Sequence, residues 1–461
     1  MRRYGLPPIE SSALSRGLSR DWEAVLFVGL VWLAQAYLLF DFISIIGTNI
    51  PFYDEWEMVP TLTGAQSITW QWLWAQHNEH RIPLPRLVYL LVHTIGGLDF
   101  RSGMYFDAGL LSLMAAVCCW AVRRLRGYTA YADAFFPLLL LHWGQAQNLS
   151  WSFQIVFVLS AALALIALLL LSTRRAMSWP VAFGIGLCAI GSPLTGGAGL
   201  ALVPALGCCA LLCAWELGRA EPGRWWAWLS VAATGLISFG LLAAYFVDYV
   251  RPARHPVSPS IEATLRGTLQ FLTNAFGGGT AAYWLAGSGA LTLALSFATA
   301  GVLLFYIFKP GVKRTRALRL LLFMGGMLCM ALGTAWARVA LNPIGLFDSR
   351  YSTLAAPFLC AAYLSWELLR NRRAAQFVQM ALCIIMAVLV IRNREHGYGE
   401  AMRAHLHLEG ILTEIRNGVP RAEIVRRHCR TLYYVCTGDV FSERLGMLRA
   451  KRSGAFAVLR D

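Results

Sequence analysis

Long apolar runs separated by short charged segments dominate the pattern along this chain. A helix needs about 20 largely apolar residues to cross roughly 30 Å of membrane hydrocarbon. Nine runs meet this requirement, at 24–46, 104–122, 153–172, 196–216, 225–247, 284–308, 318–337, 351–369 and 374–391. Two shorter runs, 132–143 and 177–191, could each be a full span or a re-entrant or broken helix. The pattern therefore predicts an all-α polytopic membrane protein with about eleven transmembrane helices.

Composition excludes a soluble globular domain. Hydrophobic residues make up 57% of the 461 residues and charged residues only 14%, whereas soluble chains carry about 25% charged residues. Before Trp22 the chain has four arginines but no short apolar core followed by small residues. We therefore expect no cleaved signal peptide.

The distribution of Lys and Arg predicts the orientation. With the N-terminus inside, the inner segments hold 19 of the 40 basic residues, the outer loops 8 and the tail after Ile391 the other 13. Basic residues in short loops favour the cytoplasmic side, and eleven spans then place the tail outside. We attribute the net charge of +15 to this topology and to contact with anionic membrane lipids, and not to nucleic-acid binding.

Three parts follow from this scheme. Residues 1–21 form a cytoplasmic segment, 22–391 the membrane domain, and 392–461 a small helical tail on the extracytoplasmic side. Two helix-like stretches of the tail, Glu400–Arg416 and Arg421–His428, are separated by a turn signal at 417–420. We expect the tail to pack on the outer face of the bundle or to act as a docking element. Cys429 and Cys436 could form a small disulfide loop or remain free thiols.

The first outer loop, 47–103, holds the most concentrated polar chemistry. Its closely spaced tryptophans 70, 72 and 74 suit interfacial helices at headgroup level. Asp54 and Glu55 follow the first span by a few residues. A carboxylate there can accept a proton from a hydroxyl nucleophile or bind a divalent cation. The alternative is that both acids simply begin a surface helix.

A second cluster lies later in the same loop, at 77–86. It combines the imidazoles of His77 and His80, the carboxylate of Glu79 and the guanidiniums of Arg81 and Arg86. An arginine can grip a phosphate through its planar fork of donors, and an imidazole can orient a hydroxyl or share a metal. A solvated polar loop is the alternative.

Amides interrupt two apolar runs at another outer end, in the segment 144–154. Gln147, Asn148 and Trp151 offer the groups that commonly bind sugars, because amides match hydroxyls and an indole covers an apolar sugar face. The amides could equally satisfy one another between helices.

The turn from Arg338 to Tyr351 is the fourth polar segment. Arg338 and Arg350 lie at outer helix ends, against the usual charge bias. Each therefore needs an anionic partner, which could be Asp348, another buried carboxylate or a lipid phosphate.

These features resemble the GT-C superfamily of polytopic glycosyltransferases, which take sugars from polyprenyl-phosphate carriers. Tyr53-Asp54-Glu55 is similar to the acidic motif of the superfamily's first outer loop. His80-Arg81-Ile82-Pro83-Leu84 is similar to its His/Lys-Pro-Pro-Leu segment, although Arg81-Ile82 replaces a proline pair. The resemblance implies that Asp54 is the catalytic carboxylate and Glu55 its helper or a cation ligand.

We therefore expect a membrane enzyme that moves a sugar from a polyprenyl-phosphate donor to a hydroxyl of a lipid or envelope glycan, with inversion. It would lie in a bacterial inner membrane, with its site facing the periplasm or exterior. Asp54 would act as the base, and Arg81, Arg338 and Arg350 would bind the donor phosphate. The expected substrate-binding residues are His77, Glu79, His80, Gln147, Asn148, Trp151 and Tyr351.

A divalent cation, Mg²⁺ or Mn²⁺, bound by Asp54, Glu55 and His80 is compatible with the sequence but not required by it. Two other functions fit the same residues. One is a transporter or flippase for lipid-linked glycans, and the other is a glycan polymerase or ligase that uses a polyprenyl-diphosphate donor.

Overall fold

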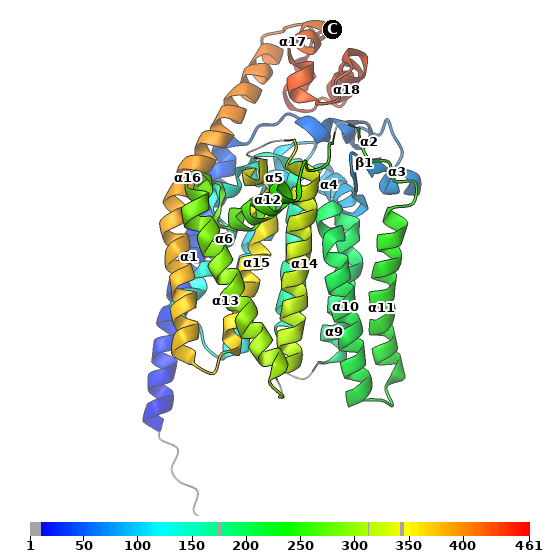
Figure 1. Cartoon of the computed structure of the whole chain (residues 1–461). Helices are drawn as coiled ribbons and strands as arrows, with labels where there is room; N and C mark the ends of the chain where they lie inside the picture. The colour runs from blue at the N-terminus through cyan, green and yellow to red at the C-terminus, as the bar shows by residue number, and fades with distance from the viewer. Residues whose placement is uncertain (1–10, 174–176, 254, 312, 342–344) are drawn as a thin grey trace, which may run out of the picture.

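The computed structural model shows a tall helical bundle with a small helical cap at one end (Figure 1). It describes residues 11–461 except 174–176, 254, 312 and 342–344, so part of the predicted segment 1–21 lies outside the described residues. The N-terminal end of α1 and the C-terminus lie at opposite ends of the molecule, which we call the lower and the upper end.

Eight helical segments among the described residues are long and apolar enough to cross a membrane. They are Asp21–Ile46 within α1 (Ser11–Ile46), α5 (Arg101–Arg126), Ser152–Leu171 with α8 (Ile155–Leu171), α10 (Gly197–Ala220), α11 (Trp225–Tyr245), Gly278–Phe308 with α13 (Gly289–Phe308), α14 (Arg314–Arg338) and α16 (Arg372–Arg416). Large apolar side chains on their outer faces are exposed, as a lipid-facing surface requires. The chain is an all-α polytopic membrane protein.

Three further runs predicted from the sequence form other elements of the bundle. The run 132–143 breaks into a 3-10 turn (Tyr131–Ala134) and α6 (Phe135–Leu140), and the run 177–191 is α9 (Trp179–Gly191). The run 351–369 forms α15 (Tyr351–Ser365) and the 3-10 turn Trp366–Leu368 that continues it. All fifteen residues of α15 are buried, so its backbone and side chains face protein instead of lipid.

The first outer loop forms short elements across the upper end of the bundle. A 3-10 turn (Tyr53–Glu57) is followed by α2 (Val59–Leu62), α3 (Trp70–Trp74), a hairpin of β1 (Gln76–His77) and β2 (His80–Arg81), and α4 (Pro83–Ile95). Among the described residues, these two strands form the only sheet. A further outer helix, α12 (Ile261–Thr273), lies near this level (Figure 1).

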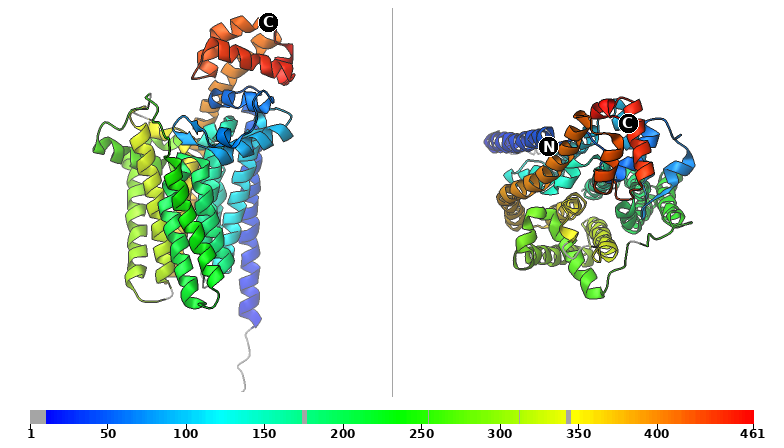
Figure 2. Two further views of the ribbon diagram at one scale, coloured as in Figure 1. Left: turned by 90° about the vertical axis from the view of Figure 1, so that its right-hand side faces the viewer. Right: turned by 90° about the horizontal axis from the view of Figure 1, so that it is seen from above.

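The tail is not separated from the membrane domain at residue 391. Helix α16 continues through this position without a break and carries the chain above the bundle, where α17 (Arg421–Leu432) and α18 (Gly438–Ala450) fold back (Figure 2). The turn predicted at 417–420 lies between α16 and α17. A core that includes Phe441 and Phe456 of the tail and Trp56 of the first loop joins the two parts, with the Trp56 and Phe441 rings 4.7 Å apart.

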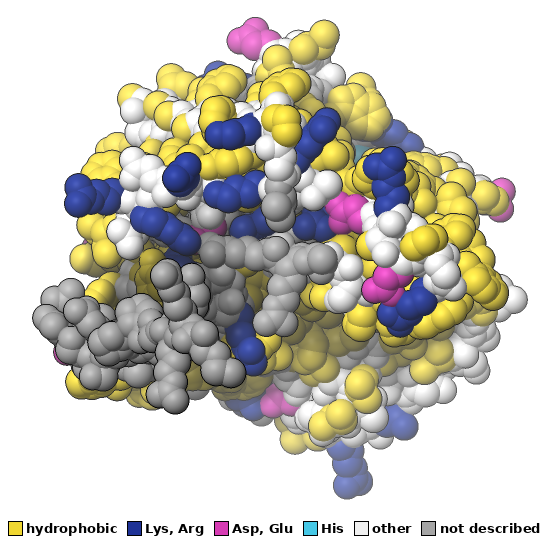
Figure 3. Space-filling view, turned by 90° about the horizontal axis from the view of Figure 1, so that it is seen from below, with side chains coloured by type: hydrophobic (Ala, Val, Ile, Leu, Met, Phe, Trp, Pro, Cys, Tyr) yellow, Lys and Arg dark blue, Asp and Glu magenta, His cyan; other side chains and the backbone are white. Residues whose placement is uncertain are grey.

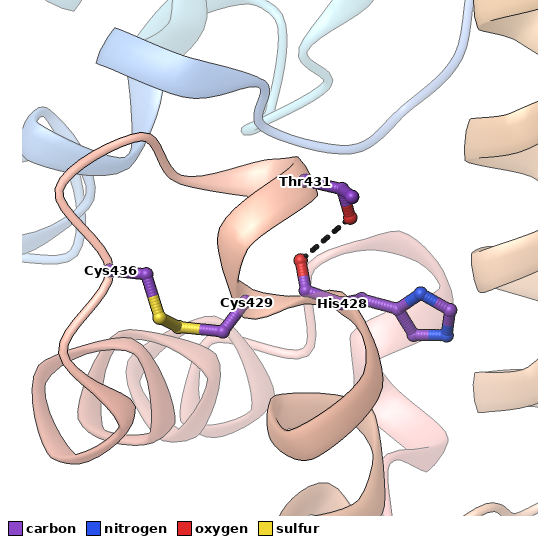
Figure 4. The surroundings of a disulfide bond; sticks show 4 residues. All are labelled: His428, Cys429, Thr431 and Cys436. Carbon is purple, nitrogen blue, oxygen red and sulfur yellow. Dashed lines mark hydrogen bonds between the residues drawn. A yellow bond between two sulfur atoms is a disulfide. The ribbon is translucent and has the colours of Figure 1, made fainter.

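A disulfide closes a loop of the tail. Cys429, near the end of α17, is bonded to Cys436, so the alternative of two free thiols is not what the structure shows (Figure 4). The closed loop contains Tyr433 and Tyr434, and it faces the first outer loop through the core just described.

Candidate functional site

A cavity of about 200 Å³ opens at the upper end of the bundle, between the first loop, the hairpin and the tail. Segments distant in sequence meet in its wall, as expected for a site built on several elements. Its lining residues are Tyr53, Asp54, His77, Asn78, Glu79, His80, Ile82, Trp151, Phe153, Gln154, Val156, Phe157, His255, Arg338, Arg350 and Tyr434.

Asp54 lies in this wall on the 3-10 turn that follows the first span. The turn begins at Tyr53, whose φ of 47° is in the left-handed region, and it is capped because the Phe52 amide donates to Glu55 Oε2 at 2.8 Å. Asp54 Oδ1 is 3.1 Å from His77 Nε2 and accepts a hydrogen bond of 3.1 Å from the Asn78 amide. Burial alone would raise the pKa of Asp54, but hydrogen bonds and the charge of His77 outweigh it and lower that pKa. The carboxylate is therefore held ionised.

His77 is clamped between two carboxylates. Its Nδ1 lies 3.0 Å from Glu57 Oε2, on the side of the ring away from Asp54. Burial would lower the pKa of the imidazole, yet the hydrogen bonds and charges of both acids raise it to about 9. At neutral pH the ring is therefore an imidazolium ion that fixes the position of Asp54.

Glu55 faces away from the cavity. Its side chain is almost completely buried, beside Tyr89 of α4 and the Phe153 backbone. Burial is the largest cause that raises its pKa to about 8. The geometry therefore favours a capping role for Glu55, and not the role of a catalytic helper beside Asp54.

The hairpin places Glu79 and His80 on the other side of the cavity. Glu79 forms ion pairs with Arg338 at the end of α14 and with His255, 2.9 Å away. The amide of Gly197, the first residue of α10, donates to His80 Nδ1 at 3.3 Å, which leaves the proton on Nε2, 3.2 Å from Glu79. A Cβ at Gly197 would approach this imidazole to 2.9 Å, so glycine permits the contact. Burial is the main cause that lowers the pKa of His80 to about 4, and the ring is neutral.

Two of the three predicted phosphate-binding arginines reach the cavity. Arg338 and Arg350 both line it, and Arg350 also pairs with Asp348 at 3.1 Å. Arg81 does not line it, because its guanidinium donates to the backbone carbonyls of Trp74, Tyr245 and Val247 at 2.6–2.9 Å. These bonds use the donors that a phosphate would need, and they tie the hairpin to the end of α11. The structure replaces the predicted phosphate role of Arg81 with this structural one.

Of the predicted sugar-binding residues in the segment 144–154, some line the cavity and others only connect helices. Trp151 lines the cavity and donates to the Phe52 carbonyl at 3.1 Å. Gln147 instead donates to Glu400 at 2.8 Å, and Asn148 donates to Thr353 at 2.6 Å and to the Arg350 carbonyl at 3.0 Å. Neither amide lines the cavity, so the geometry favours the alternative in which they connect helices.

A second, mostly apolar cavity of about 260 Å³ adjoins the first. Glu79, His80, Phe157 and Arg338 line both. From there the second cavity extends between α10, α11 and α14, where Leu200, Phe246 and Met330 are among its lining residues, and Tyr351 and Leu354 of α15 close it. The chamber that holds Asp54 therefore adjoins an apolar groove, and the two share part of their walls.

Tyr434 of the tail is the main contribution that sequence reasoning missed. Its hydroxyl donates to Asn78 Oδ1 at 2.7 Å and lies 3.2 Å from Glu57 Oε1, so it joins the hydrogen-bond network around Asp54. The signal in the sequence was a pair of tyrosines between two cysteines. Nothing local in that pattern shows which distant loop the tyrosines contact.

The predicted cation ligands do not assemble around one point. Glu55 faces away from Asp54, and His80 is committed to Gly197 and Glu79. Across the described ranges, no three His, Cys, Asp or Glu side chains are grouped so that they could hold one metal ion. The three predicted ligands therefore do not converge on one cation site among the described residues.

No protein-family model matches the chain, and no curated protein matches its sequence. Several solved structures are similar to the chain in fold. One is the archaeal oligosaccharyltransferase AglB from Archaeoglobus fulgidus in complex with an inhibitory peptide and a dolichol-phosphate, at 13% identity over 90% of this chain and 60% of that chain, with a TM-score of 0.46. The Archaeoglobus fulgidus oligosaccharyltransferase in the apo form matches at 11% identity, over 88% and 60% of the two chains, with a TM-score of 0.46.

A complex of the same enzyme with Zn and sulfate matches at 13% identity, over 87% and 57% of the two chains, with a TM-score of 0.44. This chain spans about three fifths of the length of these archaeal chains.

Proposed function

We propose that this chain is a membrane glycosyltransferase that moves a sugar from a polyprenyl-phosphate donor to an acceptor hydroxyl at the extracytoplasmic face. One observation carries the proposal. An ionised Asp54 and two arginines, Arg338 and Arg350, line one small chamber that adjoins an apolar groove. The chamber has room for a polar sugar phosphate, and the groove offers an apolar surface for a prenyl chain.

Asp54 is the proposed base. An acceptor hydroxyl next to it would attack the anomeric carbon from the face opposite the phosphate, and its proton would pass to the Asp54 carboxylate. The bond between the anomeric carbon and the phosphate oxygen breaks, its electron pair leaves with the phosphate, and the configuration inverts. Because the pKa of Asp54 is lowered, it is a weak base, and it accepts the proton late, when the attacking hydroxyl has become acidic.

Arg338 and Arg350 are the proposed donor-phosphate ligands. The donor phosphate carries one negative charge, and a second develops as the sugar leaves. Guanidinium groups already positioned in the wall stabilise this developing charge more than the ground state, which lowers the barrier. Glu79 holds Arg338, and Asp348 holds Arg350, so both groups are oriented before the donor binds.

Trp151, Tyr351 and His80 complete the proposed substrate surface. Trp151 offers an indole to a sugar face, and the neutral His80 lies where the chamber meets the groove. Tyr351 lines the groove and lies under the Arg350 guanidinium, whose carbon is 5.2 Å from the ring centre.

Replacing Asp54 by Asn tests the proposal. Purified protein is given a panel of radiolabelled polyprenyl-phosphate hexoses and pentoses, with a membrane lipid and glycan extract as the acceptor. We expect Asp54→Asn to lower kcat by about a hundredfold or more, because the amide cannot accept the proton. Binding of the same donors should survive.

Asp439→Asn is the matched control, because Asp439 is an exposed residue of the tail at the same end of the molecule. It should transfer sugar at the wild-type rate. Transfer by Asp54→Asn at the wild-type rate would contradict the mechanism. Movement of a lipid-linked glycan across vesicles with no sugar transfer would instead support the transporter, and turnover of diphosphate donors alone would support the polymerase or ligase.

A further inference from the structure

Gln154 is a buried polar side chain that the mechanism proposed above does not use. It ends the 3-10 turn Ser152–Gln154, which leads into α8. It lines the chamber that holds Asp54, and it is only 3% exposed. Among the described residues, none forms a hydrogen bond with its carboxamide. A partner for this amide must therefore come from within the chamber.

Three other amides in this part of the chain are paired with protein groups. Gln145 is as deeply buried, at 2% exposed, and it donates to the Leu140 carbonyl at 2.7 Å. Gln147 and Asn148 donate to side chains of other helices. Burying an amide without a hydrogen bond is costly, because its lost contacts with water are not replaced. Within the described residues, Gln154 differs from these three in lacking a partner, as an amide that binds a ligand does.

Gln154 lies on the side of the chamber that adjoins the groove. Phe157, three residues further along the same helical segment, lines both the chamber and the groove. Residues three apart lie on one face of a helix. The Phe157 ring is 5.9 Å from the ring of Tyr351, which lies under the Arg350 guanidinium. A sugar joined to a phosphate on Arg350 would therefore lie next to Gln154.

Given the function proposed above, we propose that Gln154 binds a hydroxyl group of the donor sugar and thereby selects that sugar. A carboxamide offers an acceptor oxygen and two N–H donors, so it can hold one hydroxyl or two neighbouring ones. The indole of Trp151 lines the same chamber and offers an apolar surface to the sugar ring. A buried polar group that pairs with a substrate hydroxyl discriminates against an analogue without it, because the group is then left unpaired.

Donor sugars and their deoxy analogues distinguish this role from a structural one. Equilibrium binding of radiolabelled polyprenyl-phosphate hexoses and pentoses, and of their monodeoxy analogues, is measured on the full-length protein in nanodiscs without an acceptor. For the wild type, we expect the loss of one particular hydroxyl to weaken binding by about tenfold to a hundredfold.

Gln154→Met should remove this preference. Methionine has nearly the same length as glutamine and leaves no polar group unpaired, so the variant should fold. The complete sugar and the analogue without that hydroxyl should then bind equally. The ratios for the other deoxy analogues should stay as in the wild type, since only one contact is lost. If Gln154→Met does not fold, Gln154→Asn withdraws the amide by one methylene group and should reduce the same preference.

Gln145→Met is the matched control, because Gln145 is an equally buried amide that does not line the chamber. It should keep the wild-type preference even if its melting temperature falls. An unchanged preference in Gln154→Met would overturn the role of Gln154 and indicate that water pairs with the amide, as would an equal loss in Gln145→Met. Sugar transfer by the wild type would leave the proposed function standing in either case. A preference that depends on Gln154 without any sugar transfer would support the role of Gln154 and contradict the proposed transfer.

Discussion

His77 controls the ionisation of the residues around it, because its ring bridges two carboxylates. Asp54 and Glu57 each lie about 3 Å from one of its nitrogens, and without a positive charge between them the two acids would repel each other. The pKa of the imidazole is raised from its ordinary value near 6.5 to about 9. The bound proton therefore stabilises the folded state fully below pH 6.5, and this contribution is lost as the pH rises through about 9.

Replacing His77 by Gln should shift the pH dependence of sugar transfer. Glutamine can still form a hydrogen bond but carries no charge, so the pKa of Asp54 should rise once the charge of His77 is removed. The acidic limb of the profile of kcat/KM against pH should then move to higher pH. His93→Gln is the control, since that buried imidazole does not line the cavity. An unchanged acidic limb would show that His77 does not set the ionisation of Asp54.

Tyr434 reaches the site from about 380 residues away, and the disulfide between Cys429 and Cys436 holds the loop that carries it. In the chain-entropy model, closing so short a loop stabilises the fold by about 2 kcal/mol. Cys429→Ser/Cys436→Ser should therefore lower the melting temperature. It should also lower kcat/KM by about three- to tenfold, because Tyr434 then holds Asn78 and Glu57 less well.

Tyr434→Phe separates the two effects. It removes the hydrogen bonds but keeps the disulfide, so kcat/KM should fall while the melting temperature changes little. A membrane-impermeant phosphine should reduce the activity of the wild type and leave the serine double variant unaffected, and Cys208→Ser serves as the control outside the loop. Wild-type activity in both the double variant and Tyr434→Phe would mean that the tail has no role in the site.

At the scale of elements, hydrophobic runs predicted the long helices and the short α9, but not where the run 132–143 breaks. The lipid environment demands length and apolarity only where a helix faces lipid, and α15 is enclosed by other helices. The first loop was predicted to contain interfacial helices, and α3 and α4 are there. The break in 132–143 depends on contacts with α1, α5 and α16, which a single run of residues does not reveal.

Within the site, residue type predicted which groups could react but not which way they point. Asp54 and Glu55 are neighbours in sequence, yet only Asp54 lines the cavity, because the amide of Phe52 captures the other carboxylate. Arg81 and Arg350 look equivalent in the sequence. The backbone carbonyls of Tyr245 and Val247, at the end of α11, accept hydrogen bonds from Arg81. These two residues lie 164 and 166 positions further along the chain.

At the scale of the whole molecule, the charge bias predicts which end of the bundle faces the cytoplasm. The predicted inner segments, at the loops 217–224 and 370–373, lie at the lower end of the bundle, and the tail lies at the upper end (Figure 1). Basic side chains gather on the lower face (Figure 3). The candidate site at the upper end would face the exterior or periplasm. The proposed function therefore depends on which side of the membrane each end occupies.

Two glycine positions can test this topology with a matched pair of variants. Gly410 lies in the part of α16 above the bundle, and Gly223 lies in the loop between α10 and α11 at the lower end. Both are exposed, and a Cβ added at either meets no atom within 4 Å, so cysteine should be tolerated at each. In intact cells, a membrane-impermeant maleimide should label Gly410→Cys above the background of the unsubstituted chain and leave Gly223→Cys unlabelled. After the cells are broken open, both should react. An odd number of predicted crossings separates residue 223 from residue 410, so the two positions should lie on opposite sides of the membrane. Labelling of Gly223→Cys alone in intact cells would invert the orientation and place Asp54 in the cytoplasm. Equal labelling of both variants would contradict the predicted topology of eleven crossings.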